Sequence, residues 1–178
     1  MKLFPMLGLT VAFFTLSAGA FGDEAQEVEK LNKILTTSKD KSAKLSALSD
    51  LGLIASINGR AVVPALPAIV NAFKSEKDPG LRTTAAYALS HVSGADNKQI
   101  VAVCITILND DKEDGTLRAA TANLVHQLAY YGCKETRDTL PALNKAKQDE
   151  MKKKMTDQNE RLLENLTKAI AHVQVLKS

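Results

Sequence analysis

Apolar residues recur along this chain with the spacing of an α-helix. Residues 81–92 carry apolar side chains at relative positions 0, 4, 7, 8 and 11, and residues 117–128 repeat this pattern with Thr121 as the one polar member. Such spacing places the apolar side chains on one face of a helix. No segment alternates apolar and polar residues for long enough to predict a strand. The pattern therefore predicts an all-α protein.

The two helices belong to a unit that occurs three times. Each copy starts with an aspartate, has a basic residue four positions later and continues into an alanine-rich helix. The aspartates lie 38 and 36 residues apart (78 − 40 and 114 − 78). A period of this length indicates stacked units that bury their apolar faces against one another. The recurring pairs are Asp40 and Lys44, Asp78 and Arg82, and Asp114 and Arg118.

A second amphipathic helix is expected after each copy, and one further helix at each end is expected to cap the stack. Gly59, Gly94 and Gly132 are expected to end the first helix of each pair, because glycine adopts the conformation common just beyond helix C-termini. The second helices are expected over 62–74, 98–108 and from 139, and the caps over 25–37 and 161–173.

The segment before the C-terminal cap leaves two predictions open. Residues 145–160 contain no Gly or Pro, so one continuous helix could run through 139–175. Asp157, with Glu160 three residues later, instead fits a capping box, which favours a break near Lys154.

The first 22 residues predict a secretory signal peptide. A positively charged start precedes the apolar run 3–14 and a stretch with small residues, and cleavage is expected after Ala20 or after Gly22. The apolar run is shorter than the roughly 20 residues that span a bilayer, and no later run is longer. We therefore expect an extracytoplasmic protein, periplasmic or secreted, with no membrane span after cleavage.

The expected organisation is one domain behind the signal peptide, as the length of 178 residues suggests. The signal peptide covers 1–22 and the domain 23–178. Within the domain we place an N-terminal cap over 23–38, repeats over about 39–76, 77–112 and 113–154, and a C-terminal cap helix over 157–175.

The repeated motif resembles the HEAT-repeat family. Asp-x-x-x-(Arg/Lys), an alanine-rich helix, a turn and a second aliphatic helix are similar to the short bacterial HEAT repeats also seen in phycobilisome-lyase-like proteins, over about residues 38–150. Lys44 in place of Arg, and Asp50 within the first apolar stripe, depart from that pattern. The resemblance implies an α-α superhelix, a HEAT-like α-solenoid of about three helix pairs plus capping helices, with a concave face lined by the second helices.

The recurring charged pairs have two explanations. In one, they form a ladder that binds a charged ligand. In the other, each aspartate caps a helix and each basic residue pairs with an aspartate of its own or the neighbouring repeat. We favour the second, because the registration of repeats by itself explains the period.

The net charge, the histidines and the absence of catalytic motifs limit the kinds of partner and reaction that the sequence supports. A net charge of +3 is too small to indicate a nucleic-acid partner. The three histidines, His91, His126 and His172, lack metal-binding spacing, and the chain contains no GxSxG, P-loop or GxGxxG motif. We therefore predict no catalytic residue, no cofactor and no metal.

The two cysteines and a cluster of lysines are expected to have structural rather than functional roles. Cys104 and Cys133 are expected to be a buried and a free thiol, with a disulfide between them as the alternative. The basic cluster 152–154 is expected to be a solvated helix face rather than a site for acidic polymers or an anionic membrane.

These inferences together predict a non-catalytic scaffold that binds a protein or peptide partner on its concave face. The alternatives are an accessory or enzymatic module acting on a small ligand, cofactor or metal, and a structural subunit of an envelope assembly that self-associates as a homo-oligomer. The candidate binding residues lie on the exposed side of the predicted second helices: Asn71, Lys74, Gln99, Thr106, Asn144 and Lys145.

Overall fold

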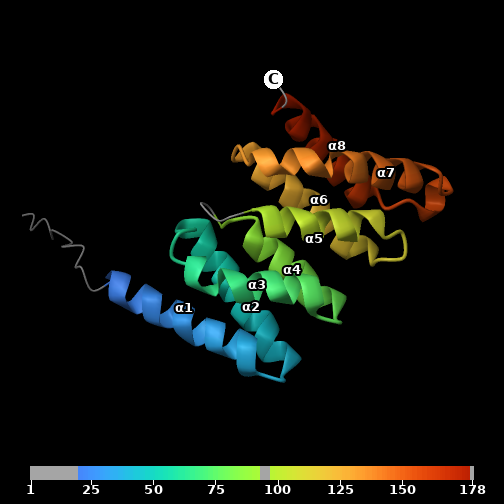
Figure 1. The fold of residues 1–178 in the computed structure, drawn as a ribbon. Helices are drawn as coiled ribbons and strands as arrows, with labels where there is room; N and C mark the ends of the chain where they lie inside the picture. The colour runs from blue at the N-terminus through green and yellow to red at the C-terminus, as the bar shows by residue number, and fades with distance from the viewer. Residues whose placement is uncertain (1–19, 93–96, 177–178) are drawn as a thin grey trace, which may run out of the picture.

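The structure is a computed structural model that describes residues 20–92 and 97–176. Within those ranges it is all-helical, with no strand, which confirms the predicted all-α class (Figure 1). Residues 1–19 of the predicted signal peptide and Gly94 lie outside the described residues. The α-helices are α1 (Ala20–Thr37), α2 (Lys41–Ile57), α3 (Leu66–Ser75), α4 (Pro79–Leu89), α5 (Lys98–Asn109), α6 (Gly115–Tyr130), α7 (Leu140–Met151) and α8 (Glu160–Val175), and the short 3-10 helices are η1 (Val63–Ala65), η2 (Lys134–Thr139) and η3 (Met155–Asp157).

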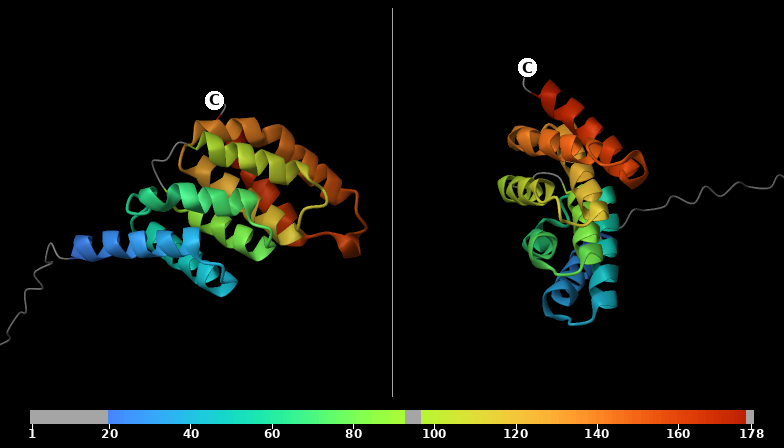
Figure 2. Two further views of the ribbon diagram at one scale, coloured as in Figure 1. Left: turned by 60° about the horizontal axis from the view of Figure 1, so that its bottom comes forward. Right: turned by 90° about the vertical axis from the view of Figure 1, so that its right-hand side faces the viewer.

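The helices lie in two layers, which the right-hand view of Figure 2 shows side by side. In one layer, here called the first-helix layer, α2 contacts α4, α4 contacts α6, and α6 contacts α8. In the other, the second-helix layer, α1, α3, α5 and α7 contact one another in the same order. Across the layers α1 packs on α2, α3 on α4, α5 on α6 and α7 on α8. The two predicted end caps thus add one helix to each layer.

The core between the layers is aliphatic. Its largest fully buried side chains are leucines and isoleucines, with Phe73 and Arg118 as the exceptions. Small residues allow the helices of one layer to approach closely: a Cβ on Gly52 of α2 would lie 3.4 Å from the Cα of Ala88 on α4. The buried apolar surface supplies most of the driving force for folding.

Aspartates begin the three helices on which the repeat was recognised. Asp40, Asp78 and Asp114 are the N-caps of α2, α4 and α6. Each carboxylate accepts a hydrogen bond of 2.9–3.0 Å from a backbone N–H two or three residues later. These bonds satisfy N–H groups that have no partner within the helix, which confirms the predicted capping role.

Gly132 ends α6 as predicted. Its φ of 80° lies in the left-handed region, and it is the one glycine with a positive φ among the described residues. The N–H of Gly132 donates to the carbonyl of Ala129, and the N–H of Cys133 donates to the carbonyl of Leu128. This pair of bonds is the Schellman arrangement, which allows the chain to turn sharply toward η2.

The helix is interrupted between α7 and α8, so the segment 139–175 contains two long helices rather than one. The predicted cap residue is wrong: Asp157 lies in η3, whereas Asn159 caps α8 by accepting a hydrogen bond of 2.9 Å from the N–H of Leu162. Asn159 therefore holds the place of the repeat aspartates. Four residues later the helix has Leu163 where the earlier copies have a basic residue.

Candidate partner-binding face

The six candidate binding residues all lie on the second-helix layer, and all six are exposed. The layer takes two of them from each of three helices, α3, α5 and α7. They are Asn71 and Lys74, Gln99 and Thr106, and Asn144 and Lys145. The helical periodicity thus identified surface positions correctly, even though it contains no information about a ligand.

The main hollow on this face lies between α3 and α5. It has a volume of about 340 Å³, within the lower part of the range typical of ligand sites. One stripe of α5 supplies amide, hydroxyl and small apolar side chains, while Lys74 and Arg82 supply two cations. The lining residues are Lys74, Arg82, Gln99, Ala102, Val103, Thr106 and Ile107. Three of the six predicted residues therefore share one groove, here called the α3–α5 groove.

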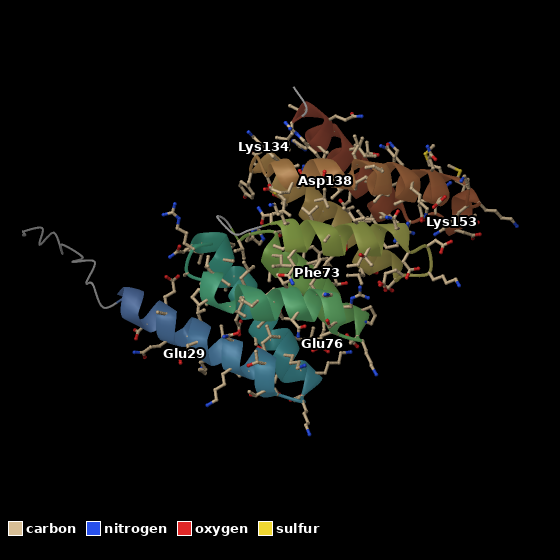
Figure 3. All side chains as sticks on the ribbon, in the orientation of Figure 1. Glu29, Phe73, Glu76, Lys134, Asp138 and Lys153 are labelled. Carbon is tan, nitrogen blue, oxygen red and sulfur yellow. The ribbon has the colours of Figure 1, made fainter. Side chains whose placement is uncertain are left out.

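Two smaller hollows continue the surface toward the N-terminus. One of about 140 Å³ includes Asn71 and Thr36 among its lining residues, and one of about 280 Å³ includes Asn32 and Glu29. Figure 3 shows Glu29 on α1 in this part of the molecule. The second-helix layer thus has hollows from α1 to α5.

Asn144 and Lys145 line none of these hollows. The amide of Asn144 donates to the carbonyl of Leu140 at 2.9 Å. The ammonium of Lys145 donates to the carbonyl of Asn109 at 3.2 Å and to Asp149 at 3.0 Å. Lys145 thus connects α7 to the end of α5. Its ammonium group, which we predicted to bind a partner, already binds groups within the chain.

The basic residues of the repeat bind glutamates, so the predicted pairing with aspartates is wrong for Lys44, Arg82 and Arg118. Their ion-pair partners are Glu76 at 2.5 Å, Glu113 at 2.5 Å and Glu150 at 3.9 Å, respectively. The aspartate side chains bind the backbone of their own helices instead, and Asp78 also pairs with Lys41. Figure 3 shows Glu76 beyond the end of α3.

The glutamates have a period of their own. They lie 37 residues apart (113 − 76 and 150 − 113), so the sequence contained the pattern that analysis of the aspartates missed. Each glutamate follows or ends a helix of the second-helix layer, and this helix is the next long helix in the chain after the one that carries its basic partner. The ion pairs therefore join the first helix of a unit to the end of the second helix that follows it, which favours a structural role over a ladder for a charged ligand.

Burial increases along this ladder of ion pairs. The exposed fractions of the basic and acidic side chains are 19% and 27% in the first pair, 16% and 19% in the second, and 2% and 0% in the third. In the third pair Glu150 also accepts from the Lys153 ammonium at 2.7 Å and from the backbone N–H of Asn159 at 2.7 Å. These contacts hold the linker to α8 against α6, and Figure 3 labels Lys153 at this corner.

Two of the three histidines meet, which the sequence did not indicate. The rings of His126 on α6 and His172 on α8 have centroids 4.5 Å apart, and the ring of Tyr130 lies 5.7 Å from that of His172. Loss of hydration at its partly buried site lowers the pKa of His126, and electrostatic repulsion from His172 and Lys168 lowers it further. Among the described residues, no group of three His, Cys, Asp or Glu side chains is arranged to hold a metal ion.

The two cysteines are both buried and both free thiols. Cys104 lies in α5, and burial raises the pKa of its thiol well above the ordinary value. Cys133 precedes η2, and its Sγ donates to a carboxylate oxygen of Glu135 at 3.3 Å. The expected burial of Cys104 is found, whereas Cys133 is more buried than we expected.

The first-helix layer also has a groove, between α2 and α4. It is broad, with a volume of about 470 Å³, and hydroxyl groups line it together with Leu53 and Tyr87. The Tyr87 hydroxyl accepts a hydrogen bond of 2.8 Å from Arg161 of α8. No residue of this groove was predicted to bind a partner.

Comparison with known proteins does not assign the chain to a family. No protein-family model matches it, and none of the curated proteins compared with it matches. Within residues 20–92 and 97–176, no helix is long and apolar enough to cross a membrane. The structure itself defines a two-layer helical protein with a hollowed second-helix layer.

Proposed function

We propose that this protein is a HEAT-like α-solenoid scaffold that binds a protein or peptide through its second-helix layer. The observation that supports this most is the α3–α5 groove, which three independently predicted positions, Lys74, Gln99 and Thr106, line together. Lysine, glutamine and threonine side chains on a groove can bind a partner by shape complementarity and hydrogen bonding, without catalysing a reaction.

The organisation of the chain supports a repeat scaffold. Capping aspartates and ion pairs between the two layers recur with each unit, and each layer adds one helix per unit. In repeat proteins this construction produces an extended surface, on which several units contact one partner. A superhelical stack of this kind is the arrangement that the HEAT resemblance implies.

We further propose that the protein acts outside the cytoplasm, after cleavage of the predicted signal peptide. From Asp23 onward, Val28 is the first buried residue of α1, so a cut after Ala20 or Gly22 removes no part of the described core. N-terminal sequencing of the protein recovered from the extracytoplasmic fraction tests this proposal. A chain that retains Met1 and stays in the cytoplasm would contradict it.

Site-specific photo-crosslinking in cells tests the binding face. A photoreactive residue at Asn71 or Thr106 is expected to capture one protein, whereas the same group at Ser46 or Thr167, exposed on the first-helix layer, is expected to capture none. Capture only from the first-helix layer would contradict the proposed face. Capture of a second copy of this chain from Asn71 would favour a structural subunit that self-associates.

A pair of charge reversals distinguishes binding from stability. Lys74 lines the α3–α5 groove, whereas Lys168 lies on the exposed face of α8, where it pairs with Glu164. We expect Lys74→Glu to abolish the crosslink from Thr106 and Lys168→Glu to preserve it. Equal effects of the two substitutions would show that the crosslink does not depend on this part of the face.

A further inference from the structure

The α3–α5 groove has an excess of positive charge, which indicates the chemistry of its ligand. Arg82 is neutralised by Glu113 and donates its Nε–H to the carbonyl of Phe73 at 3.1 Å. The exposed ammonium of Lys74 has no ion pair or hydrogen bond among the residues that the structure describes. Only one of the two cations of the groove is therefore paired with a carboxylate, and the remaining charge complements an anionic group.

The rest of the groove is suited to a short stretch of peptide. The α5 stripe from Gln99 to Ile107 extends for about 12 Å at 1.5 Å per residue. Ala102 and Val103 form an apolar centre, while Gln99 and Thr106 present polar groups on either side. The amide of Gln99 both donates and accepts hydrogen bonds, as a peptide backbone requires.

We propose that the α3–α5 groove binds an acidic peptide segment, with a glutamate or aspartate side chain at Lys74 and a small aliphatic side chain over Ala102. This inference rests on the proposed scaffold function and specifies the partner chemistry. Attraction between the Lys74 ammonium and the carboxylate sets the orientation of the peptide, and the apolar centre of the groove excludes water around it.

An array of dodecamer peptides tests the inference. The array contains sequences with Glu and Asp and matched copies with Gln and Asn, and it is probed with the secreted protein at about 0.05 M and 0.5 M salt. We expect the acidic copies to be preferred by up to about fivefold, the size of effect that an ion pair with an exposed lysine produces. This preference is expected to fall at the higher salt concentration.

Four variants locate the site. Lys74→Gln is expected to lose the acidic preference, whereas Lys33→Gln, which removes an exposed lysine from α1, is expected to keep it. Ala102→Arg fills the groove and is expected to abolish binding, whereas Ala171→Arg, at an exposed position on α8, is expected to leave it intact. Circular dichroism of each variant checks that the helices are preserved.

The outcomes separate this inference from the proposed function. Peptide binding that Ala102→Arg abolishes, but that shows no preference for acidic sequences, would overturn the acidic ligand and retain the scaffold. Acidic preference that Lys74→Gln and Lys33→Gln reduce equally would also overturn it, because the cause would then be net charge. Failure of every peptide to bind, together with no crosslink from Asn71 or Thr106, would overturn both proposals.

Discussion

Glu150 joins three segments of the chain through one carboxylate group. It contacts Arg118 of α6, Lys153 of the linker and the backbone N–H of Asn159, and its side chain is completely buried. Burial by itself would raise its pKa, but the hydrogen bonds from Lys153 and Asn159 and the nearby positive charges outweigh burial. The pKa of Glu150 is therefore below its ordinary value of 4.5.

We predict that Glu150→Gln lowers the free energy of unfolding by about 3–5 kcal/mol, because the buried Arg118 guanidinium loses its counter-charge. Denaturant unfolding at pH 7 measures the change. Glu164→Gln, which removes an exposed carboxylate paired with Lys168, serves as the control and is expected to have little effect. A loss for Glu150→Gln no larger than for this control would contradict the role of the buried pair.

The lowered pKa of Glu150 also leads us to predict that the free energy of unfolding decreases at acidic pH. Since its pKa is lower in the folded than in the unfolded chain, its ionised form stabilises the fold above about pH 4.5, and this stabilisation is lost as the pH falls through the folded value. Denaturant unfolding between pH 6 and pH 3 is expected to show a smaller loss in Glu150→Gln than in the natural protein. Parallel pH profiles would contradict this assignment.

The lowered pKa of His126 leads us to predict a second pH dependence of folding stability, at a higher pH. Its pKa is lowered by partial burial and by His172 and Lys168, so protonation favours the unfolded chain. Stability is therefore expected to decrease as the pH falls below about 6.5, and to decrease less in His126→Gln. His91→Gln, at an exposed position, is the matched control and is expected to retain the full dependence.

At the scale of single elements, the starts of α2, α4 and α6 follow from a local rule that the sequence displays. An aspartate followed by an apolar helical stripe predicts an N-cap, and Asp40, Asp78 and Asp114 all cap. The partners of the basic residues did not follow from such a rule. Lys44 and Glu76 are 32 residues apart, so the contact exists only once tertiary packing brings α2 and the end of α3 together.

The cap of α6 provides a test at this scale. The Asp114 carboxylate accepts hydrogen bonds from two backbone N–H groups, those of Thr116 and Leu117. We predict that Asp114→Ala lowers the free energy of unfolding by about 1 kcal/mol and that Asp114→Asn, which keeps the acceptor oxygen, lowers it by less. Equal losses in thermal unfolding would show that charge, rather than the cap geometry, stabilises the helix.

At the scale of the whole molecule, the period of the sequence predicted the helices but not how they pack together. The apolar stripes identified first and second helices, yet the closeness of His126 and His172 depends on the packing of α6 against α8. The α3–α5 groove likewise forms from side chains of different helices. Local periodicity determines which side of a helix is buried, whereas a groove requires the relative placement of two helices.

The graded burial of the ion pairs predicts unequal stability along the stack. The pair Lys44–Glu76 is the most exposed and Arg118–Glu150 the least. We expect amide hydrogens of α2 to exchange faster than those of α6, because repeat proteins open from their weaker units. Exchange monitored by NMR measures this difference, and equal protection of both helices would show that the protein unfolds as one unit.

The ladder of ion pairs also has a consequence for how such a protein can change in length. Each basic residue pairs with a glutamate 31 or 32 residues later in the chain, whereas α8 has Leu163 at the position of the basic residue. An internal duplication of one whole period, 37 residues from glutamate to glutamate, would supply every new cation with its carboxylate. Gene duplication can therefore add length within the array without leaving any of the new cations unpaired.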